Sequence, residues 1–176
     1  MKRLSTSKIV LCGILSALST IAFIIEGLFP PLFLPGARIG VSNVFILLTV
    51  ILLGVKYGYV TLSVKVLLGS LLSGNFFSAV YALPAGLVSL TIEILLFYFT
   101  KKISIIAISV AGAVFNTIIQ NFIFCLITNT VEYLSYLPYL ALVGVLGGVT
   151  VGLAVYLIIK ILPAKYFMND NNLEEI

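Results

Sequence analysis

Residues 41–72 read VSNVFILLTVILLGVKYGYVTLSVKVLLGSLL, and this stretch decides the fold. It holds two apolar runs, residues 41–53 and 59–72, with Gly54 and Lys56 between them. A membrane-spanning helix needs roughly 20 apolar residues, so each run is short for a crossing. Two separate helices would put Lys56 in a turn at one membrane face. One long kinked element would instead reverse the direction of every later span.

Four longer apolar runs surround this stretch, at residues 9–28, 79–99, 103–127 and 137–162. Basic residues gather on the cytoplasmic side of membrane proteins, so their positions select between the two threadings. With six spans and a cytoplasmic N-terminus, only Arg38 lies in an outer loop and Lys65 lies within a span. The cytoplasmic side then carries Lys2, Arg3, Lys8, Lys56, Lys101, Lys102, Lys160 and Lys165. Charge therefore favours six crossings with both termini in the cytoplasm.

The composition supports an all-α polytopic membrane protein. Hydrophobic residues make up 61% of the chain and charged residues 9%, and the mean hydropathy is +1.25. A soluble domain of this size would have too little polar surface. We expect a cytoplasmic N-terminus (residues 1–8), a six-helix transmembrane domain (9–162) and a polar cytoplasmic tail (163–176), in the bacterial plasma membrane. The net charge of +4 would attract anionic membrane lipid, and no nucleic-acid partner is expected.

Several enzyme classes lack their residues in this chain. Asp170 is the only aspartate, so the clustered aspartates that hold magnesium in prenyl transfer are missing. The chain contains no histidine and no GxxxxGK[ST] loop, which excludes imidazole-based catalysis and this route to ATP hydrolysis. Cys12 and Cys125 have no metal-ligand spacing. We therefore expect neither a catalytic constellation nor a cofactor or metal.

Two ionisable residues fall within the predicted spans, Lys65 in the third and Glu93 in the fourth. An unpaired charge within a span costs roughly 2.5–3.5 kcal/mol on insertion scales, so each needs an explanation. Both are expected at similar depths, about six or seven residues from the cytoplasmic end of their helix. They either form an ion pair that locks two helices, or face a cavity and meet a charged group of a ligand. The sequence leaves both interpretations open.

Amide side chains form a second polar feature, in the fifth predicted span. Asn116 and Gln120 are four residues apart and share a helix face, with Asn121 next to that face. Such amides either bind the polar atoms of a ligand or bond neighbouring helices.

The loop at residues 29–38, FPPLFLPGAR, is apolar but contains three prolines and a glycine. It cannot form a lipid-exposed helix, so we expect it to fold over the outer mouth of the bundle, as a lid or as a simple plug. Arg38 would then meet an anionic group at the entrance, cap the next helix or reach lipid headgroups.

Small residues recur every four positions in two spans. Gly13 and Ala17 lie on one face of the first, and Gly144, Gly148 and Gly152 on one face of the last. Such faces let helices approach closely. They serve packing within the bundle or docking of another membrane protein.

Residues 35–43, PGARIGVSN, resemble the PG-x-[KR]-[LI]-G-[LV]-[AS]-N signature of the Gx transporter family, also labelled heptaprenyl diphosphate synthase component I. Residues 63–69, SVKVLLG, resemble the basic motif of its third span, and the resemblance covers about residues 8–162. The family's fifth span commonly reads G-A-x-x-H-N-x-x-Q, whereas residues 112–120 here read GAVFNTIIQ. Gln120 matches, but Asn116 and Thr117 replace the His and Asn. This departure removes a titratable group, so the substrate or its contacts are expected to differ.

The chain is also similar in size, span number and outer loop to the substrate-binding S components of energy-coupling factor (ECF) transporters. This resemblance implies a component that holds a small molecule near the outer face. Gly13 and Ala17 would dock it on a transmembrane coupling protein, which two ATPase subunits drive. Our hypothesis is an S component for a small hydrophobic or amphiphilic metabolite, with polar contacts from Arg38, Asn43, Lys65, Asn116 and Gln120.

The synthase label gives an alternative hypothesis. The chain would then be a non-catalytic membrane component of a heptaprenyl diphosphate synthase system in isoprenoid quinone biosynthesis. It would hold a lipid product or anchor a prenyltransferase subunit.

Overall fold

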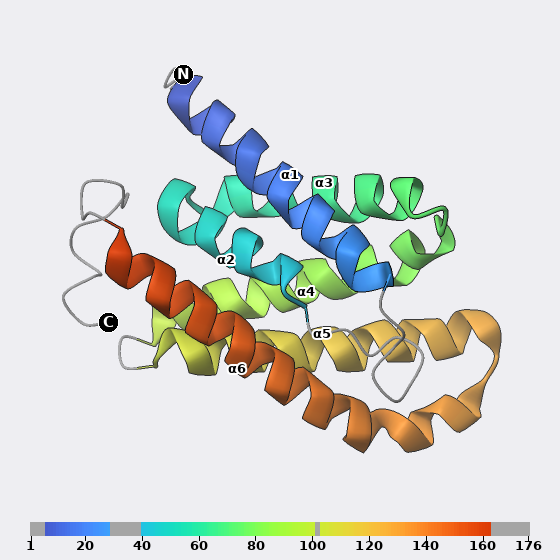
Figure 1. Ribbon diagram of the computed structural model, residues 1–176. Coiled ribbons are helices and arrows are strands. Elements are labelled where there is room, and N and C mark those ends of the chain that lie inside the picture. The colour runs from blue at the N-terminus through green and yellow to red at the C-terminus, as the bar shows by residue number, and fades with distance from the viewer. Residues whose placement is uncertain (1–5, 29–39, 101–102, 163–176) are drawn as a thin grey trace.

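The computed structural model describes residues 6–28, 40–100 and 103–162, and these form an all-helical bundle (Figure 1). The helices are α1 (Thr6–Leu28), α2 (Ser42–Leu53), α3 (Val55–Leu72), α4 (Phe77–Phe99), α5 (Ile105–Thr128) and α6 (Leu137–Ile161). A short 3-10 helix, η1 (Val131–Tyr136), leads into α6. No strand occurs in the described ranges.

Each of the six predicted runs is a helix, so the all-α prediction is confirmed. The largest difference is at α3, which begins at Val55 rather than at residue 59. Lys56 and Tyr57 lower the local hydropathy, but they do not interrupt the helical backbone. Lys56 consequently lies in the first turn of α3 rather than in a loop before it.

The direction of the chain reverses between α2 and α3. Gly54 joins them with a φ of 101°, a conformation that favours glycine. Figure 1 shows α3 doubling back along α2, so the two are not one long kinked element. The start of α1, the α2–α3 turn and the end of α6 all lie on the left of that view. This arrangement brings the helix ends that carry Lys8, Lys56 and Lys160 to the same side of the bundle.

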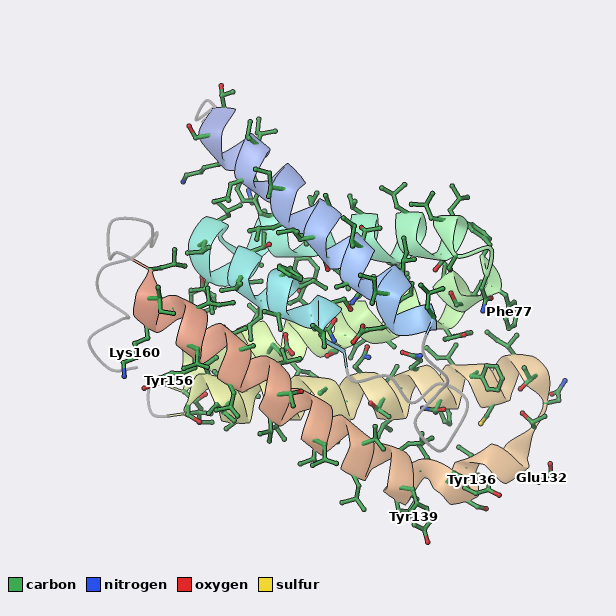
Figure 2. The ribbon with its side chains drawn as sticks, in the orientation of Figure 1. Phe77, Glu132, Tyr136, Tyr139, Tyr156 and Lys160 are labelled. Carbon is green, nitrogen blue, oxygen red and sulfur yellow. The ribbon has the colours of Figure 1, made fainter. Side chains whose placement is uncertain are left out.

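Five of the helices are long and apolar enough to cross a membrane, namely α1, α3, α4, α5 and α6. Their outward faces carry large exposed apolar side chains such as Leu126, Leu142 and Leu146, as expected for contact with lipid. In Figure 2, Tyr156 and Lys160 lie near one end of the bundle, and Glu132, Tyr136 and Tyr139 near the other. Tyrosines at both ends fit the two interfaces of a multi-pass membrane protein.

The exception is α2, which has 12 residues and is thus about 18 Å long, shorter than the roughly 30 Å of hydrocarbon. Ten of its residues are buried, so α2 is an interior helix surrounded by the others. The exact number of crossings and the orientation of the termini remain predictions.

The helices pack as two groups of three. In the first group α1 contacts both α2 and α3, and in the second α5 lies between α4 and α6. Hydroxyl groups bond the first group internally: Ser16 donates to Thr61 at 3.1 Å, and Ser19 donates to the Ser42 carbonyl at 2.8 Å. The two groups meet where α3 packs on α4 and α2 on α6.

Glycines bring α5 and α6 together in the second group. An added Cβ at Gly152 would lie 2.6 Å from the Ile106 Cα, and one at Gly148 would be as close to the Val110 Cα. Both of these atoms belong to the α5 backbone, so a larger residue at either glycine would push the two helices apart. The small face of Gly144, Gly148 and Gly152 is therefore used for packing within the bundle, one of the two roles that the sequence left open.

Candidate functional site

The second half of the sequence signature, residues 40–43, forms the turn into α2. Gly40 has a φ of 81°, and its carbonyl accepts a hydrogen bond from the Asn43 backbone at 2.8 Å. Ser42 donates its hydroxyl to Glu26 at 3.1 Å, and the Val41 backbone N–H donates to the other oxygen of Glu26. A carboxylate is stabilised at a helix N-terminus by the unpaired N–H groups and the helix dipole. Glu26 thus fastens the end of α1 to the start of α2.

Asn43 and Lys65 lie in direct contact. The Lys65 ammonium donates to Asn43 Oδ1 at 2.6 Å and lies 5.7 Å from the centre of the Phe23 ring. Only 6% of the Lys65 side chain is exposed, so its charge lies inside the bundle. A charged hydrogen bond and a cation–π contact both offset the cost of this burial. The structure thereby brings together two residues that the sequence proposed for ligand contact.

A cavity of about 20 Å³ lies beside this pair, where the two groups of helices meet. Its wall comes from four helices. Polar groups from α2, α4 and α5 face apolar side chains from α2, α3 and α4, and the lining residues are Asn43, Ile46, Leu62, Gly86, Ser89, Leu90, Glu93 and Asn116.

Glu93 and Ser89 lie one turn apart on α4 and face α5. Ser89 donates its hydroxyl to the Gly112 carbonyl at 2.6 Å. A Cβ added at Gly112 would collide with the Glu93 carboxylate, so this side chain lies directly on the α5 backbone. Gly112 therefore makes room for the carboxylate at the helix contact.

Lys65 and Glu93 are close enough for their charges to interact. The hydrogen bond of Lys65, however, goes to Asn43, and Glu93 lines the cavity. The structure thus shows a contact of Lys65 with Asn43 and places the Glu93 side chain at the cavity.

The three amides predicted on α5 differ in position. Asn116 lines the cavity, whereas Gln120, one turn further along, is half-buried and lies outside the lining. Asn121 is buried and donates to the Thr117 carbonyl within its own helix at 2.8 Å. Only Asn116 of the three is placed to contact a group in this cavity.

Other predicted residues lie away from the cavity. Gly13 and Ala17 are exposed on the outer face of α1, and nothing lies within 4 Å of a Cβ built at Gly13. Arg38 and the proposed lid, residues 29–38, fall outside the described residues.

Sequence reasoning did not single out Ser89 or the capping role of Glu26. A serine in an apolar helix carries no pattern of its own, although its spacing of four from Glu93 placed both on one face. The partners of Glu26 are Val41 and Ser42, which are separated from α1 by residues 29–39. No local sequence pattern predicts which groups after such a segment will contact Glu26.

The fold and this site define a helical multi-pass membrane protein with a polar cavity between its two groups of helices. The family model described as heptaprenyl diphosphate synthase component I matches residues 15–158, and the chain belongs to that family. Comparison with curated proteins and with solved structures found no match.

Proposed function

We propose that this chain is the substrate-binding component of an ECF-type transporter and takes up a small metabolite. The observation that carries the proposal is that Asn43, Glu93 and Asn116 line one cavity inside the bundle, and that the buried Lys65 bonds to Asn43 beside it. Burying such groups in a membrane is costly, and ionisable residues in spans are usually functional. A purely structural bundle would not need them together.

The outer face of α1 supports a partner for this function. Gly148 and Gly152 are covered by α5, whereas Gly13 and Ala17 face outward with room for a close helix contact. We assign this face to docking on a transmembrane coupling protein. Two ATPase subunits would supply the energy, since the chain has no nucleotide-binding loop of its own.

In this proposal the chain is not itself an enzyme. Three or more metal-ligating carboxylates, cysteines or histidines do not come together anywhere in the described part of the chain. The polar groups at the cavity instead suit reversible binding. Gln120 and Arg38 would contribute contacts on the outer side of the ligand, if residues 29–38 fold over it as proposed.

The family description favours a second candidate function. Under it, the chain is a non-catalytic membrane component of a heptaprenyl diphosphate synthase system and binds a prenyltransferase subunit. The apolar bundle would then hold the lipid product or anchor that subunit.

Mild purification from the native membrane, followed by mass spectrometry, separates the two candidates. A retained metabolite with a coupling protein and ATPases supports the transporter component. A retained prenyltransferase without these proteins supports the synthase component.

Substitutions then test the site. With the retained metabolite as the ligand, we expect Lys65→Ala and Asn43→Ala each to weaken binding about tenfold or more, since each removes half of a buried charged hydrogen bond. Lys160→Ala, at the far end of α6, is the matched control and should bind normally. Unchanged affinity in both site variants would show that the metabolite binds elsewhere.

A further inference from the structure

The α4–α5 wall of the cavity presents hydrogen-bond acceptors. Ser89 has one hydroxyl hydrogen, and the Gly112 carbonyl receives it at 2.6 Å. Towards any further group Ser89 therefore offers only lone pairs. The Glu93 carboxylate, one turn along the same helix, also only accepts when it is ionised. Two acceptors lie here side by side on one helix face.

Glu93 lines the cavity from α4. Its side chain is held against Gly112, where even a Cβ would collide with it. Lys65 acts on Glu93 electrostatically, and its ammonium also donates to Asn43, which lines the same cavity. A carboxylate inside a membrane protein is stabilised most by a direct cationic or donor contact.

The remaining wall adds to this acceptor set. Asn116 lines the cavity from α5, and its amide oxygen is a further acceptor there. The cavity of about 20 Å³ matches a single group about the size of a water molecule. Hard oxygen ligands and one carboxylate charge suit a small monovalent cation.

We propose that this cavity binds one small monovalent cationic group, held by the Glu93 carboxylate, Ser89 Oγ and the Asn116 amide oxygen. Two sources share this chemistry: an inorganic ion such as Na⁺, or the ammonium group of an amine ligand. Lys65 does not occupy the same place, because Asn43 and the Phe23 ring hold it on the α1–α2 side. The cavity has room for one group only, so it is a subsite for a single cationic group and not the whole of the metabolite site proposed above. Cation binding can be measured on the isolated chain.

The test measures thermal unfolding of the purified full-length chain in a neutral detergent. The chain has no tryptophan, but Cys12 and Cys125 are buried and free, so a thiol-reactive dye reports unfolding. Na⁺, K⁺, ammonium and methylammonium chlorides are titrated against N-methylglucamine chloride at constant ionic strength. We expect at least one of these cations to raise the midpoint saturably, by roughly 2–4 °C at concentrations well above its dissociation constant.

Variants connect the shift to the cavity. Glu93→Gln keeps the shape of the side chain and removes its charge, so it should abolish the cation-dependent rise in the midpoint. Ser89→Ala should reduce that rise, and it tests the site if Glu93→Gln does not fold. Glu132→Gln, an exposed acid in η1, should retain the full shift. A shift with Na⁺ alone identifies an inorganic ion, and one confined to ammonium and methylammonium identifies an amine group. No cation-specific shift in the wild-type chain, or a full shift in Glu93→Gln, would overturn the proposal.

Discussion

Glu26 shows, at the scale of single residues, how a charge near the end of an apolar run is used. Its two carboxylate oxygens accept from the Val41 backbone and from the Ser42 hydroxyl, so it caps α2 from the end of α1. Lys65 is accommodated in a similar way, by Asn43 and the ring of Phe23. Each charge is thus stabilised by groups that come from another helix.

Removal of the Glu26 cap should destabilise the fold. We expect Glu26→Ala to lower the stability by about 1 kcal/mol, because the start of α2 loses both a hydrogen-bond acceptor and a favourable charge. For a chain of this size that corresponds to a fall of roughly 2–4 °C in the unfolding midpoint. Glu26→Gln, which keeps acceptor capacity, should lose less. Equal midpoints for Glu26→Ala and the wild type would mean that α2 is capped by other groups.

At the scale of elements, a helix can place small residues inward or outward. The glycines of α6 lie against the backbone of α5, whereas Gly13 of α1 has open space beside it. α2 illustrates a second distinction, since its short apolar run is an interior helix rather than a full crossing. Hydropathy alone makes these helices look alike.

The same substitution at two glycines should therefore have different effects on stability. Gly148→Leu should destabilise the bundle by about 1–3 kcal/mol or more, since the side chain would be forced into the Val110 backbone. Gly13→Leu is the matched control and should leave the unfolding midpoint unchanged. It should, however, reduce copurification of a coupling protein if the α1 face docks as proposed. A large loss of stability in Gly13→Leu would contradict the exposed position of that glycine.

At the scale of the whole molecule, two groups of three helices meet around the polar cavity. α1, α2 and α3 form the first group, and α4, α5 and α6 form the second. The helix ends that carry Lys8, Lys56 and Lys160 lie on one side of the bundle, and η1 with Glu132 lies on the other (Figures 1 and 2). This separation allows the membrane orientation to be tested directly.

Single cysteines at these positions should label from opposite sides of the membrane. With the two native cysteines replaced by serine or alanine, Glu132→Cys should react with a membrane-impermeant maleimide in intact cells. Lys56→Cys and Lys160→Cys should react only after the membrane is opened, because the positive-inside bias places them in the cytoplasm. Labelling of Lys56→Cys in intact cells with protection of Glu132→Cys would show the inverted orientation.

The sequence by itself determined the class of protein and the positions of its helices. Hydropathy and charge can be read directly from the sequence, so six runs predicted six helices. The placement of Lys56 and the later basic residues on one membrane face predicted the reversal between α2 and α3. Polar residues within apolar runs also marked Lys65, Glu93, Asn116 and Gln120 as candidates for the site, and the segment at residues 35–43 marked Arg38 and Asn43.

Only the tertiary structure decided how these residues meet. Whether Lys65 bonds to Asn43 or to Glu93, whether a glycine faces another helix or the outside, and whether Ser89 reaches the Gly112 carbonyl all depend on the rotation and tilt of neighbouring helices. In a membrane, the lipid-facing and interior surfaces of a helix are both apolar. Apolar periodicity therefore carries little information about rotation, and packing between helices fixes it.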